Sequence, residues 1–166
     1  MKQKLLIGAL IVVGLASIAY AAFSQSLVIN GTGTTNADWD VKITGITQVD
    51  ADGATDVNGS PTFTATTATF DVELAYPGAS ATYDVTVTNA GSIDAVLDSL
   101  TDLTTVNGQA PTDITFTVSG VTAGTTALAA GATNTVTVEV EWDPASTLAT
   151  QESKTASITL NYIQDM

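Results

Sequence analysis

The sequence predicts an all-β chain, an antiparallel β-sandwich preceded by a hydrophobic N-terminal leader. The stretch Tyr83–Thr88 (YDVTVT) alternates apolar with polar residues, which is the period of a strand buried on one face. Further stretches with this period follow along the chain, separated by turn formers such as Pro77-Gly78. Beyond the leader, no stretch has a strong helical pattern. Short strands joined by turns are typical of a sandwich.

The leader has the composition of an export signal. Met1–Lys4 is basic, Leu5–Ala22 is uncharged and almost wholly apolar, and Ala19-Tyr20-Ala21 has the small-x-small pattern of a cleavage site. We therefore expect residues 1–21 to be a signal peptide that is cut after Ala21. An uncleaved anchor and a pilin-type leader cut near Gly8 are the alternatives, and all three export the rest of the chain.

A short strand is predicted directly after the cleavage site, at Phe23–Asn30. Its apolar residues are Phe23, Leu27, Val28 and Ile29, of which Phe23, Leu27 and Ile29 share one face. The stretch Gly31–Asn36 that follows has the composition of a flexible tether. We expect residues 22–36 to be a donor strand and its tether. The strand either inserts into a neighbouring subunit's sheet or folds back onto its own.

The sandwich itself is predicted over residues 37–166. Strands are expected at 38–49, 62–74, 83–88, 95–99, 112–119, 132–142 and 153–164, with a β-bulge at Gly45, where the apolar phase slips. Residues 50–61 are expected to form a polar loop. Shared strand parity predicts the core residues Trp39, Phe70, Val72, Tyr83, Val85, Val87, Phe116, Val138, Val140, Ile158 and Leu160.

Composition excludes several classes of chemistry. The 166 residues include no Cys and no His, so thiol nucleophiles, disulfides, imidazole bases and the usual zinc ligands are absent. The net charge is −13, and without Lys2 and Lys4 of the leader it becomes 2 − 17 = −15. Such a charge repels phosphate backbones and anionic membranes. We expect no nucleic-acid partner, and membrane contact only through the leader.

The loop Asp50–Gly59 is the best candidate for a metal site. Asp50, Asp52, Asp56 and Asn58 offer oxygen ligands of the kind that calcium prefers. The loop is not an EF-hand, because Ala54 stands at its fifth position and no Glu closes it. A solvated loop rich in turn formers explains the same residues, and we expect no tight metal binding and no cofactor.

Two other patterns have ordinary explanations. Glu139, Glu141 and Asp143 alternate with apolar residues, so they fit the solvent face of a strand as well as an acidic catalytic pair, and we expect no enzyme. Asn30-Gly31-Thr32 matches a glycan acceptor, which would place a sugar on Asn30, although such triplets are common.

Several short motifs in a fixed order resemble the TasA/camelysin family of secreted biofilm-matrix fibre proteins. The leader ends in AYAAFS and runs directly into the folded part, and WDVKI at 39–43 lies where the family has its first core strand. Pro77-Gly78 precedes a strand that ends in TNAGSID at 88–94, and the last strand ends in Gln164.

This resemblance implies a jelly-roll sandwich whose copies join head-to-tail into extracellular fibres by donating an N-terminal strand. The partners would be other copies of the chain and further matrix proteins. Some family members are described as proteases, but this chain lacks the His residues that such zinc chemistry normally needs. A secreted or membrane-anchored binding module and a pilin-like filament subunit are the alternative functions.

Overall fold

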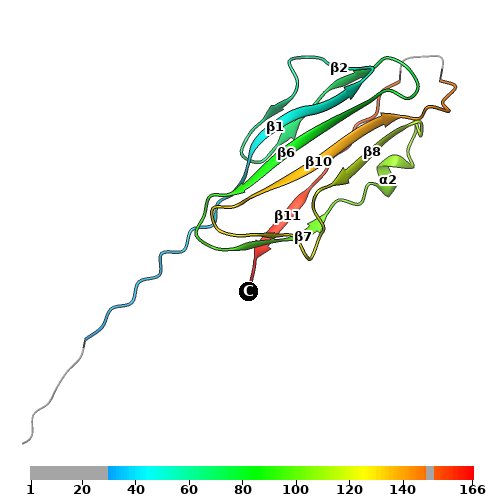
Figure 1. Cartoon of the computed structure of the whole chain (residues 1–166). Coiled ribbons are helices and arrows are strands. Elements are labelled where there is room, and N and C mark those ends of the chain that lie inside the picture. Colours follow the sequence, from blue (N-terminus) through cyan, green and yellow to red (C-terminus); the bar gives the residue numbers. More distant parts are fainter. Residues whose placement is uncertain (1–29, 149–151) are drawn as a thin grey trace, which may run out of the picture. The chain divides into compact units, whose positions relative to one another are not determined.

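The computed structural model describes residues 30–148 and 152–166, and this part of the chain is nearly all-β (Figure 1). The predicted leader and residues 23–29 of the predicted donor strand lie outside the described residues. The chain divides into two units, Met1–Thr35 and Asn36–Met166. In the first unit, residues 30–35 are exposed and form neither helix nor strand. The second unit carries every strand described below.

One layer is a four-stranded antiparallel sheet, which we call the first sheet. Its order is β1 (Val41–Asp52), β6 (Ser80–Asn89), β10 (Thr133–Trp142) and β8 (Ile114–Ser119). Along β6, buried and half-buried residues alternate strictly from end to end. This confirms the period of two on which the all-β prediction was based, because a strand turns successive side chains to opposite faces.

The opposite layer is divided into separate pieces. A three-stranded sheet has the order β11 (Leu160–Gln164), β7 (Ala95–Leu100) and β9 (Ala127–Leu128). We call it the second sheet. The short helix α2 (Thr104–Asn107) follows β7 along the chain.

Two strand pairs complete the fold. In the first, β2 (Ala54–Asp56) pairs with β5 (Val72–Leu74), and in the second, β3 (Thr62–Phe63) pairs with β4 (Ala68–Thr69). Both pairs are antiparallel and have only two strands.

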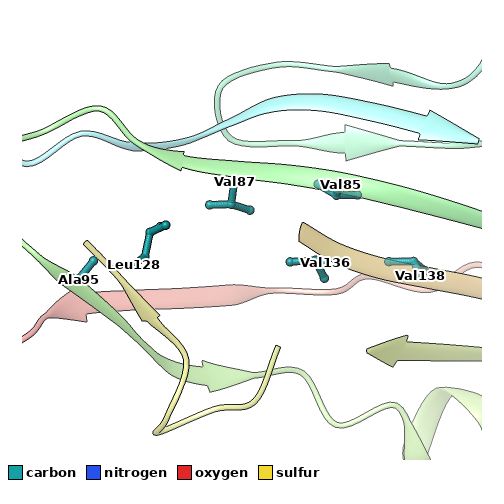
Figure 2. Packing of buried hydrophobic residues seen from close by; sticks show 6 residues of the cluster. All are labelled: Val85, Val87, Ala95, Leu128, Val136 and Val138. Carbon is teal, nitrogen blue, oxygen red and sulfur yellow. The ribbon is translucent and has the colours of Figure 1, made fainter. Parts of the chain in front are cut away.

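The hydrophobic core lies between these layers. Figure 2 shows Val85 and Val87 of β6 with Val136 of β10 on one side, and Leu128 of β9 with Ala95 of β7 on the other. A second cluster contains Ala81, Tyr83, Phe116 and Val140 from the first sheet. The predicted core residues Tyr83, Val85, Val87, Phe116, Val138 and Val140 are all buried. Four others pack against the clusters while only half-buried: Phe70, Val72, Ile158 and Leu160.

The prediction for Trp39 was wrong, because its side chain is 44% exposed. The pairing of β1 with β6 begins at Val41, opposite Asn89. Trp39 lies before this first pair, so the alternation of the strand does not turn its side chain toward the core. The predicted bulge is confirmed, since the β1–β6 register shifts between Ile43 and Gly45.

Three element boundaries differ from the prediction. The expected strand over 62–74 is broken into β3, β4 and β5. The chain reverses between β3 and β4, where Thr64 N donates to Thr67 O over 2.7 Å, and residues 70–71 between β4 and β5 belong to no strand. The expected loop at 50–61 instead contains the end of β1 and all of β2. The expected strand over 153–164 is paired only over Leu160–Gln164.

Candidate strand-acceptor site

Side chains cover the outer edge of β8. Asn107 donates from Nδ2 to Phe116 O over 2.8 Å and accepts from Phe116 N at Oδ1 over 2.9 Å. Its amide therefore stands where a neighbouring strand would bond. Lys154 Nζ donates to Ile114 O over 2.8 Å on the same edge. Uncovered strand edges invite pairing with other chains, so these side chains protect β8.

Other edges are also occupied. At the outer edge of β1, Ala65 O in the β3–β4 turn accepts a hydrogen bond from Ile43 N over 2.8 Å. The two carbonyls of β9 accept from side-chain amides of the first sheet, Asn134 over 3.3 Å and Asn89 over 3.0 Å. The described chain thus places its own groups on strands that could otherwise pair with another molecule.

The last segment of the chain has an edge without such cover. Half-buried residues alternate with exposed ones at Lys154, Ala156, Ile158, Leu160 and Tyr162. On one side, β11 pairs with β7, and Thr159 O accepts from Thr101 N over 3.1 Å. Since alternate residues direct their main-chain groups to opposite edges, the groups of the even-numbered residues face away from β7. Among the described residues, no strand pairs with that side, and 153–158 have no backbone–backbone hydrogen bond.

A second uncovered edge belongs to β5. Its pairing with β2 is flanked by two backbone bonds, Val57 N to Asp71 O at 3.0 Å and Ala75 N to Gly53 O at 2.9 Å. By the same alternation, the main-chain groups of Val72 and Leu74 face away from β2. Within 30–148 and 152–166, no strand pairs with this side of β5. We call this side of β5 and the side of 153–162 away from β7 the free edges.

Both free edges lie over the same core. Val72 and Leu74 pack against the cluster of Tyr83 and Phe116, as does Ala156 from the other free edge. Phe70 stacks on Tyr83 with ring centroids 4.4 Å apart. The core-facing residues along both free edges are only half-buried, whereas those of β6 and β10 opposite them are buried. The core is therefore covered less completely along the free edges than along the first sheet.

Tyr162, on the segment with one free edge, carries a buried polar atom. Its hydroxyl oxygen is inaccessible to solvent and has no hydrogen-bond partner among the described residues. A buried hydroxyl without a partner costs free energy.

Lys154 fixes the start of this segment by three hydrogen bonds. Its ammonium donates to Asn107 O at 3.0 Å, Pro111 O at 3.0 Å and Ile114 O at 2.8 Å. These bonds use the full donor capacity of a lysine. Burial lowers the pKa of Lys154, and the nearby charge of Asp113 opposes this shift.

The chain enters the sandwich through a fixed point. Ser92 N donates to Asp38 O over 2.9 Å, and Asp38 N donates to Ser92 Oγ over 2.9 Å. Ala90 N donates to Asp40 O over 2.7 Å. A Cβ on Gly91 would collide with Asp38 O, so only glycine permits this close approach.

The candidate metal ligands point to separate partners. Asp52 accepts from Tyr76, Asn58 donates to Asp71, and Asp50 accepts from the adjacent Ala51 N. Asp56 accepts from Tyr83 and Gln48. Among the described residues, no group of three or more acidic residues could hold a metal ion.

The other sequence-predicted sites are placed as follows. Asn30 is exposed, while Phe23, Leu27, Val28 and Ile29 lie outside the described residues. Glu139 and Glu141 stand opposite Thr and Ser residues of β6 and β8, on the face away from the core, and Glu139 accepts from Thr117 over 3.4 Å.

Comparisons of the chain with protein-family models, curated proteins and solved structures found no match. The resemblance to the TasA/camelysin family therefore stays a prediction. Within the described part of the chain, no helix is long and apolar enough to span a membrane.

Proposed function

We propose that this chain is an exported structural protein, the subunit of an extracellular fibre or biofilm matrix. In this proposal, Phe23–Asn30 of one copy inserts between the free edges of the next copy, and the contact repeats head-to-tail. The observation that carries it is the pair of free edges over a partly covered core. We assign the chain no catalytic role.

Backbone geometry supports strand insertion. An added strand gains hydrogen bonds from the edge, and its alternate side chains fill apolar positions beneath it. Val72, Leu74 and the even-numbered residues of 153–162 supply the unpaired edge groups. The apolar face formed by Phe23, Leu27 and Ile29 supplies side chains to cover the half-buried core. The strand over 23–30 is long enough to cover most of the 153–162 edge.

The tether allows the strand to reach another molecule. Residues 30–35 are exposed and form neither helix nor strand, and hydrogen bonds that hold the chain to the sandwich are made by Asn36 and Asp38. Six residues span at most about 20 Å when fully extended. Because one copy's strand fills the next copy's edges, the contact is head-to-tail and can propagate as an open filament.

Deleting Phe23–Asn30 tests the proposal. We expect the mature chain to form fibres visible by electron microscopy and the deleted chain to sediment as a monomer. The double variant Leu27→Asp, Ile29→Asp should also stay monomeric, because strand insertion would bring two charges into an apolar environment. The matched control is Ser24→Asp with Ser26→Asp, which adds equal charge to the opposite face and should still polymerise.

Two results would reject this mechanism. One is fibre formation by the deleted chain. The other is a mature chain that stays monomeric at high concentration, which would favour a strand folded back on its own sandwich and a role as a monomeric surface module. N-terminal sequencing of the exported chain separates the remaining alternatives, since a start near Gly8 indicates a pilin-like subunit.

A further inference from the structure

We propose that Lys154 is a latch that holds residues 153–159 in place and so keeps one of the two free edges formed. This inference rests on the proposed function and concerns the residue that positions its binding surface. Residues 153–158 have no backbone–backbone hydrogen bond among the described residues, yet they keep a strict alternation of half-buried and exposed positions.

An extended segment that has no backbone hydrogen bonds to a neighbouring strand must be held in place by other contacts. Fixing each backbone residue opposes folding through lost conformational entropy. At the C-terminal end, order comes from β11 and from Thr159, which donates to Thr101 Oγ1 over 2.8 Å. At the other end, the ammonium of Lys154 donates to three carbonyls within 3.0 Å.

The carbonyls come from a separate part of the chain. Asn107, Pro111 and Ile114 lie between the end of α2 and the start of β8, at least 40 residues before Lys154. The ammonium therefore ties the last segment to the edge of the first sheet. Half-buried Ala156 and Ile158 assist it by packing on the core.

Removing the ammonium should loosen the segment without unfolding the sandwich. The first sheet is paired through four strands, and its buried residues take no part in the latch bonds. A loosened segment no longer presents a row of edge groups at fixed spacing, so strand insertion would have to order it first. Lys154 thus acts as a positioning residue for assembly.

The test uses the full mature chain with Lys154→Met, which keeps the length of the side chain and removes its charge and donors. Lys42→Met is the matched control, because it makes the same change of charge at a lysine whose ammonium pairs with Asp40. Amide hydrogen exchange is measured in chains that also carry Leu27→Asp and Ile29→Asp, so that assembly does not protect the segment. Fibre formation is measured in chains with the native N-terminal strand.

We expect Lys154→Met to speed exchange of the Thr159 amide, which is bonded to Thr101 Oγ1, at least tenfold, and to slow fibre growth at least tenfold. Exchange at Val85 and Val138 should stay unchanged. Lys42→Met should change neither exchange nor fibre growth, and Lys154→Arg should change both less than Lys154→Met does. Unchanged exchange at Thr159 in Lys154→Met overturns the latch. Faster exchange with normal fibre growth overturns its role in assembly. If the unmodified chain forms no fibres, the proposed function fails while the exchange result still decides the latch.

Discussion

At the scale of single residues, Asn89 links the two layers from within the core. Its side chain is fully buried, donates to Ile93 O over 2.7 Å and to Leu128 O over 3.0 Å, and accepts from Gly91 N over 3.1 Å. All three partners are main-chain groups near one end of the sandwich. A buried amide with every polar atom bonded fixes their positions more strictly than apolar packing would.

Asn89→Ala should therefore destabilise the fold by about 2–4 kcal/mol, because it leaves buried main-chain groups without partners. Urea unfolding of the mature chain measures the effect. Asn134→Ala is the control, since it removes one longer bond from a half-buried side chain and should cost less than about 1 kcal/mol. Equal effects of the two substitutions would contradict the role assigned to Asn89.

Tyr83 should make stability depend on alkaline pH. Burial, followed by the hydrogen bond and charge of Asp56, raises the pKa of Tyr83 above its ordinary value. The folded chain then keeps a proton that the unfolded chain releases above about pH 10. This stabilisation is complete below about pH 10 and is lost as the pH rises from there toward the folded-state pKa.

The expected slope is a loss of up to about 1.4 kcal/mol per pH unit above pH 10 for this one proton. Urea titrations between pH 7 and 11.5 measure it. Tyr83→Phe should flatten the curve above pH 10 although it lowers stability at pH 7, and Tyr76→Phe, at an exposed tyrosine, should flatten it less. A Tyr83→Phe curve parallel to that of the unmodified chain would be inconsistent with this account.

At the scale of elements, β6 organises the fold. It pairs with β1 on one side and with β10 on the other, and its inward residues contribute to both core clusters. Val85→Asp should cost more than about 3 kcal/mol, because it buries a charge without a partner. Thr86→Asp, one residue along and on the opposite face, is the matched control and should change stability by less than about 1 kcal/mol. The melting temperatures of both variants check this. Similar melting temperatures would show that Val85 does not face the core and Thr86 the opposite side.

The sequence predicted β6, β8 and β10 well because their side chains follow the period of two without interruption. It predicted the core face of Phe70 and Val72 but not the turn before them, which separates β3 from β4. That turn depends on Thr64, whose hydroxyl accepts from Thr67 N over 3.1 Å, and threonine is also a common strand residue. Residue propensity alone could not distinguish a threonine that forms a turn from one that continues a strand.

The candidate site was less predictable than the strands. The Asp50–Gly59 loop looked like a site because its Asp residues and Asn58 are close in sequence. In the structure, Asp52 and Asp56 instead accept from Tyr76 and Tyr83, and Asn58 donates to Asp71. Lys154 and Asn107 carry no local signal, since their partners lie far along the chain or depend on which strand is at an edge. The one available hint was that Lys154 is one of only two lysines beyond the leader.

At the scale of the whole molecule, the proposed subunit combines a strand to donate and edges to receive one. A net charge of −15 beyond the leader opposes close approach of copies elsewhere on the surface. Assembly would then depend on the specific contact at the free edges, where hydrogen bonds and apolar cover outweigh the repulsion. Because β5 and β11 belong to different sheets, a strand inserted between them would join the two pieces of the divided layer.

Strand donation between copies can be trapped by an engineered disulfide, because the chain has no cysteine of its own. One batch of mature chain carries Ser26→Cys on the polar face of the proposed donor strand. A second batch carries a single cysteine in place of Thr155, Ser157 or Thr159, the exposed residues of the segment with the free edge. The two batches are mixed and oxidised, and products are separated without reductant.

Strand donation between copies predicts a mixed dimer of the two batches for at least one of these positions, and none with cysteine at Thr135 on the outer face of the first sheet. A chain carrying both cysteines should yield a ladder of multimers. Closure of that double variant into a monomer, with no mixed dimer at any position, would contradict strand donation between copies.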